Sequence, residues 1–335
     1  MKKRRFIAVI AMAALMITCG MGVYLVYQHQ LNLPMNLSET AILRIEPGDS
    51  LTAIVRQLEQ RGWIDYPYFI IHAGRSMGLA RSIKTGEYEI RPGLTPLQFL
   101  SLIANGKVIQ YSLTLPEGWT FAQVMAAVSS NQHLRHTLDN SDHESIMQNL
   151  GHPGMHPEGR FFPDTYMFPA GTSDVDFLLR AYQSMDQILA EEWLQRSPDL
   201  PYHDSYQALI MASIIEKETA VPDERFKIAG VFVRRLQRGI KLQTDPTVIY
   251  AAGTGFNGDI TSRDLELESP YNTYLFPGLP PTPIAAPGRE SIRAALQPEA
   301  GKTLYFVAMD NGRHYFSETL AEHNQAVARY QLKKQ

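Results

Sequence analysis

Two glutamates stand two positions apart in the segment ASIIEKETAV, residues 212–221. Apolar residues at helical spacing precede them, and Asp204 or the serine after it is a suitable N-cap, so the sequence predicts a helix that runs to about Thr219. Two positions on a helix correspond to about 200° of rotation, so the carboxyl groups of Glu216 and Glu218 point in different directions. Any carboxyl chemistry on this helix therefore belongs to one glutamate and not to a pair.

Glu218 lies on the bulkier apolar face of this helix, which it shares with Met211, Ile214 and Ile215. Burial on that face disfavours the charged carboxylate and raises the pKa, so the acid would keep its proton near neutral pH. Such an acid can protonate the oxygen of a leaving group. Periodicity alone favours a simpler interpretation, in which Glu218 forms a salt bridge at the edge of the apolar face.

Glu216 lies beside small residues, among them Ala212 and Ser213. Residues three and four positions apart share a helix face, so this carboxylate faces a different neighbourhood from Glu218. We expect Glu216 to form a structural ion pair, with Arg234 and Arg235 as candidate partners.

Two downstream segments are rich in proline, amides, hydroxyls and tyrosines and show no regular period: KLQTDPTVIY, residues 241–250, and SPYNTYLFPGLPPTPIAAPG, residues 269–288. Ordered loops of this composition suit the wall of a cleft that hydrogen-bonds sugar hydroxyls and stacks on sugar rings. A loop stiffened by proline for purely structural reasons has the same composition. With these segments downstream, chemistry on a carbohydrate becomes the better interpretation of Glu218.

Other site classes find no support in the sequence. It contains no Gly-rich phosphate loop and no Gly-x-Ser-x-Gly elbow. The histidines of HLRH, residues 133–136, have no His-Glu-x-x-His pattern beside them, so they predict a solvated surface pair rather than a metal site. We expect neither a metal nor a cofactor.

The charge distribution argues against a nucleic-acid partner. The chain has 335 residues and a formal net charge of −3, but four of its basic residues stand at positions 2–5. Without these four, 27 basic residues face 34 acidic ones, which gives a net charge of −7. An acidic domain lacks the basic surface of a nucleic-acid binder.

An uncharged run of 22 residues, Phe6–Tyr27, follows the basic start. About 20 apolar residues span a bilayer, whereas the apolar part of a cleaved signal peptide is shorter, about 7–15 residues. We therefore expect a single-pass anchor in the inner (plasma) membrane. Basic residues before the run keep the N-terminus cytoplasmic and place residues 28–335 in the periplasm. The only cysteine, Cys19, lies in the anchor, so no disulfide is expected outside it.

A small unit of strand, Pro/Gly turn, hydroxyl or Asp cap and amphipathic helix occurs three times, in residues 42–62, 87–107 and 111–131. The first copy carries PGDSL and resembles a LysM-type module, a class that binds N-acetylglucosamine polymers. A generic strand–turn–helix unit has the same spacing. The third copy is expected to lead into the next domain.

The predicted fold class is α+β, with one transmembrane helix, a small LysM-like α/β subdomain and a mixed α+β catalytic domain. The domains expected in chain order are a basic tail (1–5), the membrane helix (6–27), a linker (28–40), the LysM-like subdomain (41–112) and the catalytic domain (113–335).

Several long blocks of the sequence resemble the endolytic murein transglycosylases, the YceG-like family. They are EGRFFPDTYMF, ASIIEKETAVPDE, LQTDPTVIYA, SPYNTY, GLPPTPIAAPG, and LYFVA followed by HYFSETLAEHN. The resemblance covers nearly the whole chain, with anchor, LysM-like segment and catalytic domain in the same order.

The resemblance implies roles for individual residues. The catalytic glutamate of the family is the one followed by Thr or Ser, which is Glu218 here, in agreement with the helix-face argument. The residues expected to bind substrate in the cleft are Gln243, Asp245, Tyr250, Asn272, Tyr274 and Glu158.

The reaction implied is that of a peptidoglycan lytic transglycosylase. A glycoside hydrolase normally needs two carboxylates, whereas a lytic transglycosylase needs one. Glu218 would protonate the oxygen of the β-1,4 bond between N-acetylmuramic acid (MurNAc) and N-acetylglucosamine (GlcNAc), and would then deprotonate the MurNAc C6 hydroxyl, which closes a 1,6-anhydro ring. Endolytic cleavage and the termination of glycan elongation also come from the resemblance.

Two other function classes stay open at this point. One is a hydrolytic muramidase that pairs Glu218 with Asp245 or Glu158. The other is a non-catalytic, membrane-tethered protein that binds peptidoglycan. The partners expected in every case are peptidoglycan glycan strands and the inner membrane, and peptidoglycan synthases are candidates.

Overall fold

The computed structural model describes residues 2–79, 83–138 and 142–332. The chain divides into two units, which we describe separately. The first unit holds residues 1–111 and 168–171. The second unit holds residues 112–167 and 172–335.

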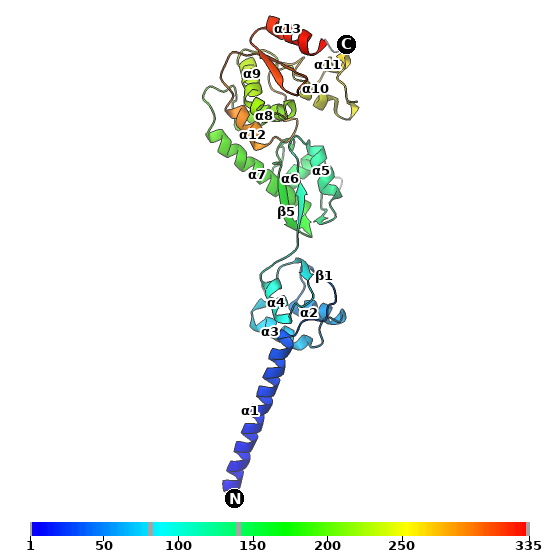
Figure 1. Ribbon diagram of the computed structural model, residues 1–335, viewed down its shortest axis with the longest axis vertical. Helices are drawn as coiled ribbons and strands as arrows, with labels where there is room; N and C mark the ends of the chain where they lie inside the picture. The colour runs from blue at the N-terminus through cyan, green and yellow to red at the C-terminus, as the bar shows by residue number, and fades with distance from the viewer. Residues whose placement is uncertain (1, 80–82, 139–141, 333–335) are drawn as a thin grey trace. The chain divides into compact units, whose positions relative to one another are not determined.

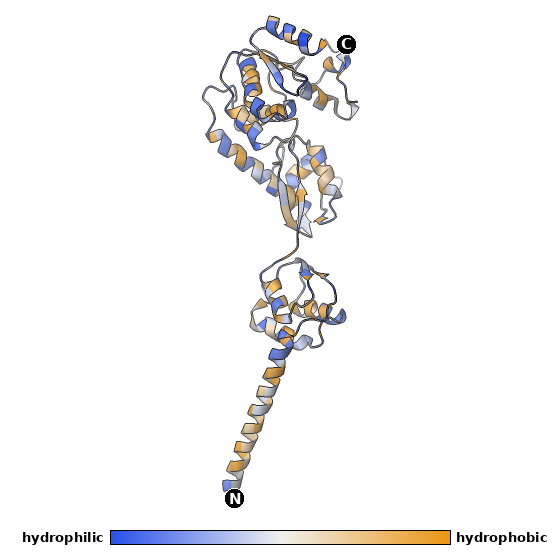
Figure 2. Cartoon of the chain, viewed as in Figure 1, coloured by the Kyte–Doolittle hydropathy of each residue, from blue (hydrophilic) through white to orange (hydrophobic). Residues whose placement is uncertain are grey.

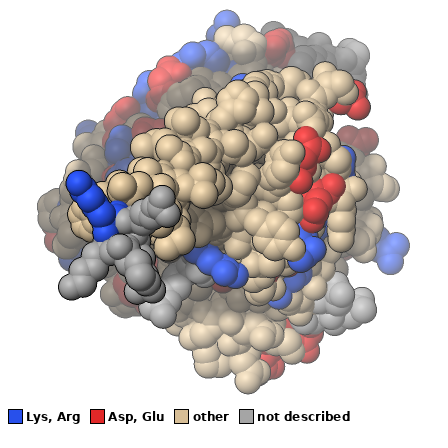
Figure 3. Space-filling model, turned by 90° about the horizontal axis from the view of Figure 1, so that it is seen from below, with Lys and Arg blue, Asp and Glu red and all other residues tan. Residues whose placement is uncertain are grey.

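The first unit begins with a long apolar helix, α1 (Lys2–Asn32) (Figures 1 and 2). Its segment Phe6–Asn32 has a mean hydropathy of 2.4 over its most apolar window, none of which is buried. The helix is therefore long and apolar enough to cross a membrane or to serve as a signal sequence. Figure 3 shows a face on which uncharged side chains cover most of the surface.

The chain after the apolar run is not an extended linker. Helix α1 continues to Asn32, and the side chains of Leu31 and Met35 are buried in the core of the first unit at 3% and 5% exposure. The ring of Tyr27 packs edge-on against Phe69 at 5.7 Å. The expected linker, residues 28–40, thus contributes to folding of the unit that follows it.

The rest of the first unit is a pair of antiparallel strands with helices packed between and after them. The elements are β1 (Ala41–Ile45), α2 (Leu51–Gln60), α3 (Pro67–Ser76), β2 (Gly86–Ile90) and α4 (Pro96–Ala104). Strands β1 and β2 pair with Leu43 opposite Tyr88, and both side chains are fully buried.

The repeated unit seen in the sequence forms the predicted local structure in all three copies. The turn glycines Gly48, Gly93 and Gly118 all have positive φ, which glycine adopts without steric cost. Each following helix has a hydroxyl N-cap, and Ser50 accepts from the backbone N–H of Ala53. The third copy comprises β3 (Gln110–Thr114) and α5 (Phe121–Ser130), and its helix lies in the second unit.

The core of the second unit is a group of four helices: α7 (Asp174–Leu194), α8 (Ser205–Glu218), α9 (Arg225–Gln237) and α12 (Arg289–Leu296). Helix α8 is buried along almost all of its length, and α12 packs on α7, α8 and α9 (Figure 1). A helix that is apolar on every side must be surrounded by others, which is the position of α8.

The remaining elements surround this core. An antiparallel hairpin, β7 (Tyr305–Ala308) and β8 (His314–Ser317), carries α13 (Leu320–Tyr330) packed on it. The other strands are β4 (Leu134–Arg135) with β6 (Thr172–Ser173), which are parallel, and β5 (Thr165–Pro169), which pairs with β3. The other helices are α6 (His143–Asn149), η2 (Pro222–Glu224), α10 (Asp245–Ala252), η3 (Gly253–Gly255) and α11 (Ser262–Leu265). The predicted mixed α+β class is confirmed.

Candidate active site

Glu218 is the last residue of α8. Its helix starts at the predicted N-cap, where the Asp204 side chain accepts from the backbone N–H of Gln207. It ends because Thr219 adopts an extended conformation and Pro222 follows shortly after. The carboxyl group therefore stands at the point where a buried helix meets a cavity.

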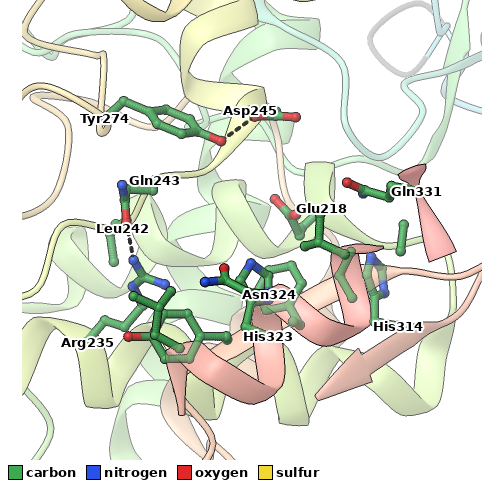
Figure 4. A pocket seen from close by; sticks show the side chains of 16 residues that line it. Glu218, Arg235, Leu242, Gln243, Asp245, Tyr274, His314, His323, Asn324 and Gln331 are labelled. Atoms are coloured by element: carbon green, nitrogen blue, oxygen red, sulfur yellow. Dashed lines mark hydrogen bonds between the residues drawn. The ribbon is translucent and has the colours of Figure 1, made fainter. Parts of the chain in front are cut away.

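The cavity at Glu218 has a volume of about 490 Å³. The end of α8, Arg235 of α9, the segment around the start of α10, Tyr274, the β7–β8 hairpin and α13 form its wall (Figure 4). The polar side chains that line it are Glu218, Arg235, Gln243, Asp245, Tyr274, Tyr305, His314, His323, Asn324 and Gln331.

Burial raises the pKa of Glu218 to about 7. Two neighbours act in opposite directions: the hydroxyl of Thr244 donates to Oε2 over 2.6 Å and lowers the pKa, while the nearby charge of Asp245 raises it. The side chain is partly exposed, and it lines the cavity. At neutral pH an acid with this pKa is present in both its protonated and its ionised form, so it can give up a proton and take one back during a reaction.

Asp245 is the second carboxylate of the cavity. It begins α10, and its Oδ1 accepts a hydrogen bond from the hydroxyl of Tyr274 over 2.6 Å (Figure 4). Burial and this bond to a carboxylate both raise the pKa of Tyr274, so the phenol remains a donor. The pair presents polar atoms to a ligand next to Glu218.

Gln243 is held in place by its backbone and by Arg235. Its φ of +53° lies in the left-handed region that non-glycine residues seldom adopt. Its side-chain oxygen accepts from the Arg235 guanidinium, which also donates to the carbonyls of Lys241 and Leu304 (Figure 4). Three of the residues expected in the cleft from the sequence, Gln243, Asp245 and Tyr274, thus share the cavity with Glu218.

The other three residues expected to bind substrate are not among those that line this cavity. Glu158 is 4% exposed, and its two oxygens accept from the backbone N–H of Phe121 and from the hydroxyl of Tyr250, at 2.9 and 3.0 Å. Burial raises the pKa of Glu158 to about 7. Asn272 is fully buried and donates to the carbonyls of Leu265 and Leu267. Their substrate-binding role stays a prediction.

Glu216 has the structural role expected from the sequence, but the expected partner is wrong. Its carboxylate accepts from the backbone N–H of Gly288 over 3.0 Å and lies 3.8 Å from the guanidinium of Arg225. Arg234 and Arg235 instead donate to backbone and side-chain oxygens around residues 299–304 and 241–243. Arg225 is the first residue of α9, and its side chain reaches Glu216 of α8. The sequence patterns did not show where α9 begins, so this arginine was not considered.

Several cavity residues had no predicted role. His314 comes from β8, and His323, Asn324 and Gln331 come from α13 and its end. Three of them lie in the block HYFSETLAEHN, and its two histidines and its asparagine could have indicated a polar segment of the site. Nothing local in the sequence, however, shows that this hairpin folds over the end of α8 about a hundred residues earlier.

Comparisons with known proteins agree on one family. Residues 43–329 match the model of the YceG-like family. The endolytic murein transglycosylase of Bacillus subtilis (strain 168) is 31% identical over 315 residues, which cover 87% of this chain and 85% of that protein. That of Streptococcus pneumoniae serotype 2 (strain D39) is 25% identical over 347 residues, 92% of this chain and 62% of the relative. A crystal structure of a protein described as YceG-like from Listeria monocytogenes matches with a TM-score of 0.55 and 32% identity, covering 86% of this chain and 99% of that one.

Proposed function

Because the chain belongs to the YceG-like family, we propose that it is a lytic transglycosylase that cleaves the β-1,4 bond between MurNAc and GlcNAc in peptidoglycan strands. The observation that carries the assignment of chemistry is the position of Glu218, whose pKa is about 7 and which lines the cavity at the end of a buried helix. A single acid of this kind is sufficient for the reaction.

Glu218 acts first as an acid and then as a base. It transfers its proton to the glycosidic oxygen while the bond from that oxygen to the MurNAc anomeric carbon breaks, so the GlcNAc part leaves with a hydroxyl. The carboxylate then takes the proton of the MurNAc C6 hydroxyl, whose oxygen bonds to the anomeric carbon and closes the 1,6-anhydro ring. Glu218 ends protonated, and no water is consumed.

The surroundings of Glu218 suit both halves of this cycle. Burial favours the acid in the first half, and the Thr244 hydroxyl stabilises the carboxylate in the second half. Asp245, Tyr274 and Gln243 provide hydrogen-bonding groups for sugar hydroxyls and acetamido groups in the same cavity.

The hydrolytic muramidase is the second candidate, since Asp245 lines the same cavity as Glu218. In that mechanism Asp245 would activate a water, and the products would carry reducing MurNAc ends. Glu158 is a weaker second carboxylate, because both of its oxygens are occupied by Phe121 and Tyr250 and it does not line the cavity.

Digestion of isolated glycan strands by the full-length chain in detergent, in water enriched in 18O, separates the candidates. A transglycosylase gives 1,6-anhydro ends without solvent oxygen at the anomeric carbon, and mass spectrometry detects them. Incorporation of 18O into most product ends would establish the muramidase. A protein that only binds glycan would give no new ends.

We propose that the first unit holds the catalytic unit close to its substrate. The order β1, α2, α3, β2, with both helices between two antiparallel strands, supports a LysM-like subdomain for GlcNAc polymers. Helix α1 would anchor it in the inner membrane with the N-terminus cytoplasmic and the catalytic unit periplasmic. Endolytic cleavage near the membrane would end the elongation of nascent strands, and peptidoglycan synthases are the expected neighbours.

A further inference from the structure

Glu224 is a buried carboxylate that holds the start of strand β8. It ends η2 and is 3% exposed. Its Oε1 accepts from the backbone N–H of His314 over 3.1 Å and lies 3.3 Å from Nε of Arg313. Its Oε2 lies 2.8 Å from Nδ1 of His314. One carboxylate therefore fixes both the backbone and the ring of His314.

The contact to Glu224 decides which ring atom of His314 is available to a ligand. A carboxylate accepts hydrogen bonds, so Nδ1 carries the hydrogen that faces Glu224 and Nε2 remains at the other side of the ring. The ring packs edge-on against Phe306 at 5.3 Å, which limits its rotation. Within the described residues, Nε2 has no hydrogen-bond partner, and His314 lines the same cavity as Glu218 (Figure 4).

We propose that His314, oriented by Glu224, is a further substrate-contacting residue, whose Nε2 hydrogen-bonds a sugar hydroxyl of the strand bound against Glu218. The inference rests on the proposed function for its ligand, a glycan rich in hydroxyls. A hydroxyl both donates and accepts, so it can pair with Nε2 whether the ring is neutral or charged. Glu224 acts through His314 and is a positioning residue.

A purely structural role for Glu224 is the competing explanation, because it also contacts Arg313. The chain offers a matched control in Asp223, the residue before it. Asp223 pairs with the same Arg313 guanidinium but is 65% exposed, and among the described residues it forms no hydrogen bond or ion pair with His314. Loss of Asp223 therefore weakens the attachment of the hairpin without changing the orientation of the histidine ring.

The test compares His314→Ala, Glu224→Gln and Asp223→Asn in the full-length chain, with kcat and KM measured on glycan strands. We expect His314→Ala to lower kcat/KM by about tenfold, the effect of one lost hydrogen bond in the transition state, mainly through kcat because other contacts hold the strand. Glu224→Gln should lower kcat/KM several-fold, again mainly through kcat, and Asp223→Asn should have the kcat and KM of the wild type. Added imidazole should restore part of the activity of His314→Ala and none of that of Glu218→Gln.

Activity of His314→Ala within twofold of the wild type would overturn the proposal. So would equal losses in Glu224→Gln and Asp223→Asn with equal falls in Tm, because Glu224 would then only attach the hairpin. Should His314→Ala fail to fold, His314→Gln enters the same comparison, and loss of activity with an unchanged Tm supports the proposal. If the wild type itself forms no anhydro ends, the proposed function fails. If the wild type forms them and the variants do not behave as expected, only the role of His314 is contradicted.

Discussion

The hydroxyl of Thr244 donates a hydrogen bond to Oε2 of Glu218 over 2.6 Å. This bond stabilises the carboxylate and lowers the pKa of Glu218, whereas burial and the charge of Asp245 raise it, and the balance is a pKa of about 7. The acid form needed for the first half of the reaction is present below that pH and is lost above it. Activity should therefore decline as the pH rises through about 7.

Substitutions of the two neighbours should move this decline in opposite directions. Thr244→Val removes the bond that favours the carboxylate, so the pKa of Glu218 rises and the decline shifts to higher pH. Asp245→Asn removes the negative charge, so the pKa falls and the decline shifts to lower pH. The measurement is kcat/KM against pH for both variants and the wild type, compared at the pH of half-maximal activity.

The direction of the shift identifies the group, whatever the loss in overall rate. Glu158 also has a pKa of about 7, but neither Thr244 nor Asp245 is among the groups that set it. A decline that stays at the same pH in both variants would show that a group other than Glu218 controls the rate.

Glu218→Gln should abolish cleavage and stabilise the fold at alkaline pH. The amide keeps the shape but has no proton to transfer. Because the folded chain binds the proton of Glu218 more tightly than the unfolded chain, the free energy of unfolding falls as the pH rises from about 4.5 to 7. The variant avoids that loss, so it should exceed the wild type by on the order of 2 kcal/mol at pH 8. Urea denaturation at pH 4 and at pH 8 measures the difference in unfolding free energy between the variant and the wild type at each pH. A variant that is less stable than the wild type at pH 8 would contradict the burial of this acid.

Glu216→Gln should do the reverse and lower stability while leaving cleavage largely intact. Glu216 is not among the residues that line the cavity, and its carboxylate contacts Arg225 and the backbone of Gly288. The pair is mostly buried, so loss of the charge should cost about 1–3 kcal/mol of unfolding free energy. Thermal unfolding and an activity assay on the same sample check the two parts. An inactive but fully stable variant would assign the chemistry to Glu216 instead.

Local sequence patterns were sufficient to place Glu218 on the buried face of its helix, because that information lies within one helix, whereas its catalytic role came from the downstream segments and the family resemblance and stays a prediction. Apolar residues at helical spacing separate the face of Glu218 from that of Glu216, and the cap at Asp204 fixes where α8 starts. The same holds for the three turns at Gly48, Gly93 and Gly118, where a Pro/Gly turn and a hydroxyl cap decide the conformation.

Long-range contacts could not be derived in this way. The approach of the β7–β8 hairpin to the end of α8 depends on packing between segments far apart in the chain, so His314 received no role. The partner of Glu216 was wrong for the same reason, since two arginines of α9 looked equally suitable and a third, Arg225, is the one that reaches it. The resemblance implied a cleft role for Asn272, which stays a prediction, but it could not show that the buried amide also donates to the carbonyls of Leu265 and Leu267.

Truncation of the N-terminus should separate anchoring from folding. A chain that starts at residue 28 loses most of the apolar segment but keeps Leu31 and Met35, which are buried in the first unit. We expect it to be soluble and to cleave isolated glycan strands, but to replace the full-length chain poorly in cells, because it is no longer held at the membrane.

A chain that starts at residue 38 also loses the side chains of Leu31 and Met35. Since each fully buried side chain of this size contributes about 1.5–3 kcal/mol, its first unit should unfold more easily. Calorimetry of both fragments tests this, and Leu31→Ala in the longer fragment is the control, expected to lower the Tm by part of the difference. Equal Tm values for the two fragments would show that the end of α1 does not belong to the core of the first unit.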